Sequence, residues 1–552
     1  MAKTFWLWIG SCVGAILLLL AGTAALRGVG VFKPQHIIIS RQTTWITGPL
    51  DKDGGVDYAA WLNQRDSRGV TPANNAVVAL LKITGTGPGV LGNKTVTRKI
   101  LHTLGIKPPD VPHPYMSFFK YEKLHDLKNK KGLPSGVGHH PWAAAQHPHI
   151  AAWLAGQHTA LAEATAAARM KHAYFPVFVL KRNGCLDMDS PFYLLGDIAN
   201  ISEAFAARSM LLASSGDYAG AWRDIVTIHK LGNLAGRGPF LLNLLTCDTV
   251  NSIAMSQVES LAKTGKIPAS LCKNWLVSLR RWQKVPSLAA AFNTGERLAG
   301  LTHFQYWATH GLAGFSRDLN PGHMRGSRLN FNAMMVRWNT ICNRIVIAAH
   351  KATYKEEQIA LNQACFWYDQ FSDADFAPMA SQMPARLVAK RLIDYGFNVP
   401  IWPAVLLASE RSERNMARVG LALAAFRAAN GVYPPALATL IPKYFKTVPS
   451  NAFTGKPLHY CDGKNSHGYL LYCFEISGGS KKSHVSGELT LTSNWPGPKI
   501  RRWINLPIGV TKNMWRHRRW YNLPTLVTCH CKPAPQTQPT PKLPKGFPSL
   551  GR

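Results

Sequence analysis

The sequence predicts a mainly α protein with a small α+β C-terminal module, an N-terminal transmembrane helix and an exported helical-bundle domain built from helix hairpins. Three observations predict this class: an uncharged apolar run near the start, helical spacing of apolar residues through the middle, and Pro- and Gly-punctuated segments near the end. A chain of 552 residues is too long for one compact core, so several domains are expected.

The first segment, residues 1–30, is predicted to be a membrane anchor. The stretch from Phe5 to Leu26 contains no charged residue, and as a helix it reaches about 33 Å, enough to cross the hydrocarbon core of a bilayer. Its length favours an uncleaved signal-anchor, while the small residues of AGTAAL leave a cleaved signal peptide as the alternative. We therefore expect a single-pass protein of the bacterial cytoplasmic membrane, with the bulk of the chain on the exported, periplasmic side.

Composition and periodicity divide the exported part into six segments. In the first of them, Thr71 is the predicted N-cap of a helix and Pro72 its first residue. In the helical domain, Ala207 and Ala221 lie in two helices separated by SSGDY; the pair resembles a tetratricopeptide-type repeat, but a single copy favours an ordinary bundle. The segments are a small helical region (41–105), an irregular Pro/Gly/His-rich segment (106–149), a helical domain (150–400), an α+β module (405–480), a basic aromatic region (481–532) and a Pro-rich tail (533–552).

The α+β module is predicted from the Gly and Pro residues that separate its helices and strands. Arg411 to Asn430 has the apolar spacing of an amphipathic helix, and Gly431 offers the left-handed residue that ends one. The sequence ALATLIP then predicts a short second helix. The segments LHYC and YLLYCF alternate as two strands do, with a loop from Asp462 to Gly468 between them.

The sequence of this α+β module resembles those of known bacterial protein families. LALAAFRAANGVYPPALATLIPKYFKTVPSNAFTGKPLHY resembles the globular domain of major pseudopilins from type II secretion. It is more similar still to the C-terminal module of large uncharacterised membrane-anchored bacterial envelope proteins, which also carry segments similar to GPLDKDGGVDYAAWLNQ and GDYAGAWRD. The resemblance implies an α+β fold but no established activity. In pseudopilins this helix continues into a membrane segment beside a Glu, and a pilus-subunit role is not expected here because the apolar run lies far upstream and has no Glu.

The charge balance is strongly basic, which is typical of a generally basic envelope protein and also suits an anionic partner. Lys and Arg number 63 against 29 Asp and Glu, a formal net charge of +34. Such a surface attracts nucleic acid, acidic glycan or anionic lipid, although a generally basic envelope protein without a specific partner is the alternative. Near the C-terminus cations interleave with indoles, a combination that suits anion binding, unless the tryptophans pack inward from an edge strand. The candidate anion-binding residues are Arg501, Arg502, Trp503, Trp515, Arg516, Arg518, Arg519 and Trp520.

Two clusters are candidate metal sites. Asp51, Asp53 and Asp57 in DKDGGVD could present oxygens to calcium, but Leu62 stands where a calcium loop needs Glu, and the alternative is a turn in which Asp57 caps the next helix. Imidazoles of the second cluster could hold zinc or copper, and a basic surface loop is the alternative. The histidines of the second cluster are His139, His140, His147 and His149, with His158 nearby. In EISGGSKKSH, Glu475 alone cannot complete a calcium shell.

Known catalytic motifs are absent from the sequence, so the sequence favours a protein that is not an enzyme and has no cofactor or identified small-molecule substrate. Glu296, Asp373 and Asp375 are the carboxylates that could act as acid or base. The leading interpretation is a membrane-anchored scaffolding or interaction protein in an envelope complex. The alternatives are a binder of anionic polymer through the basic C-terminal region and an exported hydrolase without a recognisable motif. Ten cysteines are too few for a disulfide scaffold, and no pairing follows from them.

Overall fold

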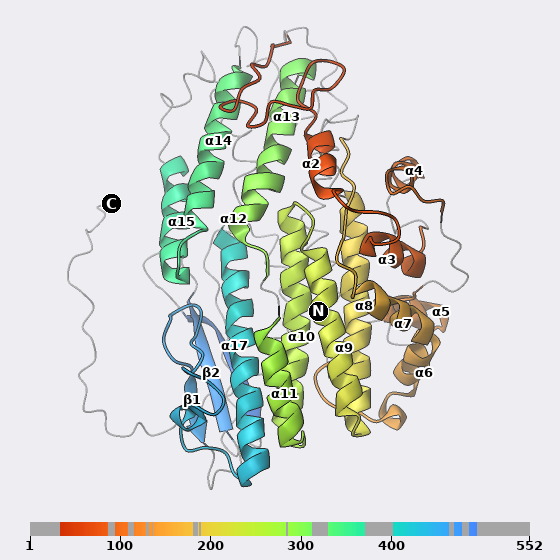
Figure 1. Ribbon diagram of the computed structural model, residues 1–552, viewed down its shortest axis with the longest axis vertical. Helices are drawn as coiled ribbons and strands as arrows, with labels where there is room; N and C mark the ends of the chain where they lie inside the picture. Colours follow the sequence, from red (N-terminus) through yellow and green to blue (C-terminus); the bar gives the residue numbers. More distant parts are fainter. Residues whose placement is uncertain are drawn as a thin grey trace, which may run out of the picture.

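The computed structural model describes residues 34–86, 94–108, 115–127, 132–134, 136–179, 186, 189–282, 285–311, 329–369, 401–462, 469–476 and 485–493. Within these ranges the chain is mainly helical, which confirms the mainly α class, and the longer helices run along the long axis of the molecule (Figure 1). The predicted anchor (1–30) and Pro-rich tail (533–552) lie outside the described residues.

None of the helices in the described ranges has both the length and the hydropathy that crossing a bilayer requires.

The first third of the described chain forms short helices, and the starts of α2 and α3 follow side-chain caps at Asp57 and Asn75. The predicted helix start at Thr71 is wrong: residues 71–75 form a turn in which Asn74 Oδ1 accepts a hydrogen bond from the Thr71 N–H (2.8 Å). The helix begins later, where Asn75 Oδ1 accepts from the Val77 N–H (3.1 Å), because an asparagine oxygen satisfies a free amide of the first turn. The elements are α2 Tyr58–Asp66, α3 Ala76–Thr84, α4 Lys94–Thr103, α5 Phe118–Leu124, η2 Ala144–Gln146, α6 Pro148–Gly156 and α7 His158–Ala167.

Longer helices follow, beginning with the predicted hairpin α8–α9. Gly216 turns the chain with φ +86°, and Asp217 then caps α9 by accepting from the Gly220 N–H (2.7 Å). Ala207 and Ala221 are fully buried, which allows the close packing that the sequence predicts. The elements are α8 Asp189–Ser214, α9 Tyr218–Ala235, α10 Leu241–Thr264, α11 Ala269–Arg280, α12 Leu288–Ala291, the π-helical turn η3 Phe292–Glu296, α13 Arg297–His310, α14 Phe331–Ala348 and α15 Tyr354–Asp369.

The C-terminal elements begin with the long helix α17, Ile401–Asn430, which starts ten residues before the predicted Arg411. Gly431 ends it with φ +80°, and the short 3₁₀ helix η6 (Leu437–Leu440) follows, both as predicted. Strands β1 (His459–Asp462) and β2 (Tyr469–Ile476) lie where two strands are expected. A third strand, β3 (Val485–Ser493), was not predicted; it pairs antiparallel with β2 in the order β1-β2-β3. The sheet therefore extends past residue 480.

The described residues form two hydrophobic cores, which two helices share. The first core gathers residues of α3, α6 to α11, the second half of α17, η6 and the start of β2. The second core gathers residues of α2, η3, α13, α14, α15 and the first half of α17. Helix α10 packs along α17, and each contributes to both cores, so the predicted boundary between residues 400 and 405 falls within one packed helix (Figure 1).

Candidate functional site: a two-tryptophan pocket

A candidate site lies where the loop of residues 40–48 passes α2. Local hydrogen bonds build this loop: the Thr44 N–H donates to Ser40 O (2.9 Å), and the Thr44 hydroxyl donates to the same oxygen (2.8 Å). The Tyr58 hydroxyl of α2 donates to Thr44 O (3.1 Å), which fastens the loop to the helix. Trp45 follows Thr44 with φ +65°, a conformation that costs a bulky L-residue about 1–3 kcal/mol. Such strain persists only where the surroundings hold it.

Arg297 holds Trp45 from beneath. The side chain of Arg297 is fully buried, and its guanidinium carbon lies 3.8 Å from the centroid of the Trp45 ring, well within the range of a cation–π contact. Arg297 comes directly after the π-helical turn η3, which widens the helix at this point. Irregular turns of this kind are frequent at functional sites.

Asparagine oxygens, rather than carboxylates, receive the Arg297 guanidinium. Its Nη1 donates to the main-chain oxygen and Oδ1 of Asn339 (both 3.1 Å), and its Nη2 donates to Asn343 Oδ1 (2.8 Å) and Asn293 Oδ1 (3.0 Å). Burial lowers the pKa of the guanidinium from its ordinary value, yet an arginine stays charged at neutral pH. No ion pair joins it to a carboxylate in the described part of the chain, so its charge lies beneath Trp45 uncompensated by an acid.

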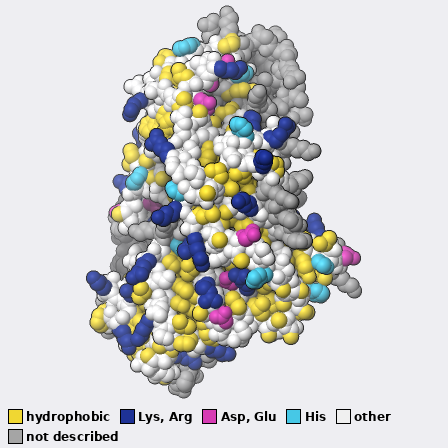
Figure 2. All heavy atoms as spheres, turned by 45° about the vertical axis from the view of Figure 1, so that its right-hand side comes forward, with side chains coloured by type: hydrophobic (Ala, Val, Ile, Leu, Met, Phe, Trp, Pro, Cys, Tyr) yellow, Lys and Arg dark blue, Asp and Glu magenta, His cyan; other side chains and the backbone are white. Residues whose placement is uncertain are grey.

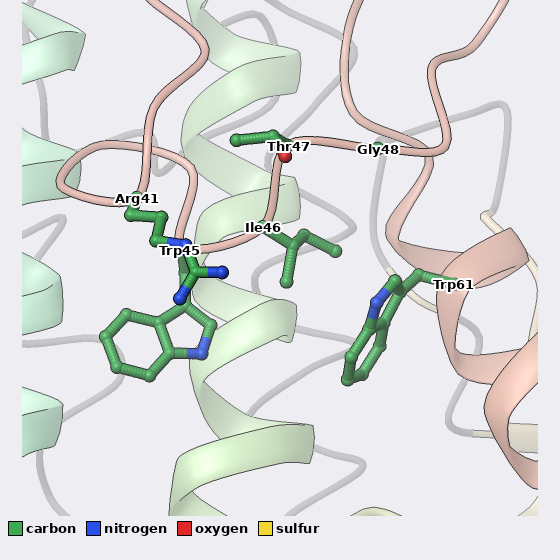
Figure 3. Close-up of a pocket in the computed structure, with 6 residues that line it drawn as sticks. All are labelled: Arg41, Trp45, Ile46, Thr47, Gly48 and Trp61. Carbon is green, nitrogen blue, oxygen red and sulfur yellow. The ribbon is translucent and has the colours of Figure 1, made fainter.

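Above this support lies a pocket of about 410 Å³, within the size range of small-ligand sites. Trp45 and Trp61 lie on either side of Ile46, and the Arg41 side chain reaches back toward Trp45 (Figure 3). Arg41 is exposed and the two tryptophans are partly buried. The residues that define this two-tryptophan pocket are Arg41, Trp45, Ile46, Thr47, Gly48 and Trp61, and the lining contains no carboxylate.

A second pocket, the α4 pocket, repeats this combination of cations and aromatic rings. It has a volume of about 640 Å³ and is lined by Arg98, Lys99, His102 and Thr103 of α4 and by Phe178. The Lys99 ammonium lies 5.8 Å from the centroid of the Phe178 ring. This lining also lacks a carboxylate. Both pockets thus present positive charge beside a flat ring, which is an arrangement suited to anions.

The predicted calcium cluster is a structural loop. Asp51 Oδ1 accepts from the main-chain N–H groups of Asp53 and Gly55 (both 2.9 Å), and Asp57 Oδ1 caps α2 by accepting from the Ala60 N–H (2.8 Å). The capping role is the alternative that the sequence left open, and it is confirmed. Leu62 is fully buried. The loop is fixed to α13 through Gln305, which both donates to and accepts from the main chain of Val56 (both 3.0 Å).

The predicted histidine cluster spreads over a surface segment. His139 is partly buried and its Nδ1 lies 2.8 Å from Ser256 Oγ; burial lowers the pKa of this imidazole to about 4. His147 lies edge-on to Trp142, while His140 and His149 are exposed, as is the neighbouring His158. Among the described residues, no three side chains of His, Cys, Asp or Glu lie close enough to share a metal ion.

The remaining predicted site residues do not meet in the two pockets. Glu296 belongs to η3, where it accepts from the Leu241 N–H (2.9 Å) and burial raises the pKa of its carboxyl. It lines neither pocket. Asp373 and Asp375 lie outside the described residues, as do all the C-terminal anion-binding candidates, namely Arg501, Arg502, Trp503, Trp515, Arg516, Arg518, Arg519 and Trp520.

A buried ionic junction between the two cores also escaped the sequence analysis. It consists of Asp248 on α10 and Glu410, Glu413 and Arg414 on α17. Arg414 Nη2 lies 2.5 Å from Glu410 Oε1, and the Glu410 side chain is only 3% exposed. Burial, together with the nearby charges of Glu410 and Glu413, raises the pKa of the Asp248 carboxyl well above its ordinary value. Asp248 Oδ1 receives no hydrogen bond from the described residues.

No protein-family model, no curated protein and no solved structure matches this chain.

Proposed function

We propose that the protein binds an acidic polymer through the two-tryptophan pocket and the α4 pocket. The observation that carries this proposal is that each pocket combines at least one exposed cation with an aromatic ring and has no carboxylate in its lining. In the view of Figure 2, Lys and Arg side chains are spread over a face that shows few Asp and Glu side chains, in keeping with the net charge of +34. An anion that approaches such a face is attracted before it reaches either pocket.

In both pockets the cations and the aromatic rings have different roles in binding. Guanidinium groups bind carboxylate, sulfate or phosphate through paired N–H donors, and the rings hold these cations in place by cation–π contact. The support under Trp45 fixes the ring before a ligand arrives, so little ordering is needed on binding. Hydrolysis is supported less well, because Glu296 lies in neither lining.

The setting of this binding activity is part of the same proposal. Residues 5–26 anchor the protein in the bacterial cytoplasmic membrane as a single pass and hold the described body on the periplasmic side. There it acts as an interaction protein within an envelope complex. The resemblance of residues 405–480 to the pseudopilin globular domain supports a module of the type II secretion kind, which here also takes in the start of α17 and strand β3. The basic aromatic residues from Arg501 to Trp520 add a further surface for the polymer.

Chromatography on immobilised heparin tests the binding activity. The wild-type protein should be retained, and the variant Arg41→Ala with Trp61→Ala should bind at least tenfold more weakly, because it loses a cation and a stacking ring. Retention should also fall steeply with salt. The matched control is Lys273→Ala, which removes one exposed cation from α11. Equal losses in the pocket variant and the control would reduce the effect to net charge and contradict the proposal.

Fractionation of cells tests the setting. The full chain should sediment with membranes, and added protease should reach its described body only after the outer permeability barrier is opened. Recovery of the intact chain in the soluble cytosolic fraction would contradict the anchored, exported location, whatever the result on heparin.

A further inference from the structure

We infer that the two pockets are parts of one continuous track, which binds a single extended acidic glycan across both. This inference rests on the proposed function and adds to it the form and class of the ligand. Its basis is the position of α2, which contributes Trp61 to one pocket and is fixed directly to the segment that contributes Phe178 to the other.

The connection is made by one asparagine. Asn63 Nδ2 donates to Val177 O (2.7 Å), and Asn63 Oδ1 accepts from the Val177 N–H (2.8 Å) and from the Tyr174 hydroxyl (2.9 Å). Three hydrogen bonds from one short side chain hold α2 and residues 174–177 in a fixed relation. The spacing of the two pockets is therefore set by the fold.

That spacing is short enough for one polymer. Asn63 is two residues from Trp61, and Val177 is next to Phe178. Because neighbouring Cα atoms are ~3.8 Å apart and the Asn63–Val177 hydrogen bond is direct, the Cα atoms of Trp61 and Phe178 lie within about 20 Å of each other. A chain of a few repeating units spans this distance. Of the acids close to Trp61 in the sequence, Asp66 is paired with Arg65 at 2.5 Å, and Asp57 caps the start of α2.

The rings favour an acidic glycan over single-stranded nucleic acid. Nucleic acid binds such surfaces mainly by stacking bases on open aromatic faces. Here a cation lies over a face of each ring: Arg297 at 3.8 Å from the Trp45 centroid, Arg65 at 5.2 Å from Trp61 and Lys99 at 5.8 Å from Phe178. Arg41 also reaches toward Trp45 (Figure 3). One face of each ring is thus taken by a cation, which leaves fewer faces for bases. The exposed Arg41, Arg98 and Lys99 are available for carboxylate or sulfate groups.

A length series of heparin-derived oligosaccharides tests the track, with binding followed by tryptophan fluorescence. A disaccharide fills one pocket, whereas a dodecasaccharide spans both, so its affinity should be about a hundredfold higher because the second contact becomes intramolecular. Arg41→Ala should remove most of this gain, and Arg98→Ala with Lys99→Ala should remove it to the same extent. Combining all three changes should remove no more of the gain. Lys273→Ala should leave it unchanged.

The outcomes separate the track from the proposed function. If the long oligosaccharide binds but each set of variants lowers its affinity independently, the pockets act separately and the track is wrong, while anion binding stands. If a single-stranded oligonucleotide of equal charge shows the length gain and the glycan does not, the ligand class is wrong. If neither probe binds, the proposed function itself fails. Urea unfolding of each variant confirms that the changes at exposed cations leave the fold intact.

Discussion

The buried ionic junction and the two-tryptophan pocket place arginines in opposite settings. In the junction, Arg414 pairs with Glu410 at 2.5 Å and both side chains are largely withdrawn from water. In the pocket, Arg41 is exposed and Arg297, which is buried beneath Trp45, is held by asparagine oxygens alone. The two settings differ in the partner of the arginine: Arg414 has a carboxylate, whereas Arg41 and Arg297 have none among the described residues. In the proposed function, the exposed Arg41 is the arginine that meets the ligand.

Breaking the ion pair of the junction should give the largest effect. Arg414→Ala leaves Glu410 buried without its counter-ion and should lower the free energy of unfolding by about 3–5 kcal/mol. Urea denaturation measures the loss. The control is the double variant Glu410→Gln with Arg414→Met, which removes both charges and should recover most of the stability. A small loss in Arg414→Ala would mean that the junction is not a structural pair.

Removing the charge beneath the pocket should have a smaller effect on stability and an additional effect on binding. Arg297→Met leaves the buried Oδ1 of Asn339 without its guanidinium donor, while Asn293 is half-buried and Asn343 is exposed; the loss should cost about 1–3 kcal/mol of unfolding free energy. Heparin retention should fall as well, because Trp45 loses its support. Arg414→Ala, measured where it is still folded, should retain full heparin binding. If Arg297→Met binds heparin normally, Arg297 has only a structural role.

The pH dependence of stability should report Asp248. Its pKa in the folded chain is raised by burial, Glu410 and Glu413, against the opposing charges of Arg411 and Arg414, so the folded state holds the proton more tightly than the unfolded chain does. The contribution of Asp248 to the free energy of unfolding is therefore fully present at low pH. It is lost as the pH rises from about 3.9, the pKa of an aspartate in the unfolded chain, toward the raised pKa in the folded chain. Relative to Asp248→Asn, the wild type should lose up to about 1.4 kcal/mol per pH unit in that range. Parallel pH profiles of the two proteins would contradict this.

The smallest effect should come from a carboxylate close to the pocket that has a structural role. Asp57→Ala removes the cap of α2 and should cost about 1 kcal/mol of unfolding free energy. Heparin retention should be unchanged at a temperature where both proteins are folded. The conservative variant Asp57→Asn should recover the stability, because an asparagine oxygen also caps a helix. If the wild type binds calcium more tightly than Asp57→Ala does, the prediction of a metal site at Asp51, Asp53 and Asp57 would be supported.

Local patterns in the sequence predicted the helices well. The α8–α9 hairpin was predictable because its apolar spacing and its cap at Asp217 depend only on residues close together in the sequence. The cap of α3 was misplaced because Thr71 and Asn75 are both good caps, and only the turn made by Asn74 decides between them. β3 also had a readable signal, since Val485, Leu489 and Leu491 alternate, but the basic residues that precede it pointed to a surface region.

The candidate site was harder to predict because its residues meet only in the folded chain. Arg297 has one partner four residues away, Asn293, while Asn339 and Asn343 are 42 and 46 residues distant. Arg41 and Trp45 lie outside the segments that carry the resemblance, and the resemblance of GPLDKDGGVDYAAWLNQ assigns no role to Trp61. The clusters predicted from the sequence, by contrast, were short segments rich in one residue type. In the structure, the aspartates form a turn and a helix cap, and the histidines spread over a surface segment. Clusters of one residue type within a short segment were thus a weaker indication of a site than residues distant in the sequence that meet in the fold.

The sharing of α10 and α17 between the two cores limits how this protein can have been assembled by recombination. A segment that starts near residue 401 looks portable, yet its helix α17 packs along α10 and buries apolar residues in both cores. Transplanted alone, it would bring an unmatched apolar face to a new host. The smallest unit that can be inherited intact is therefore the helix pair, so changes in one of these helices should be accompanied by compensating changes in the other.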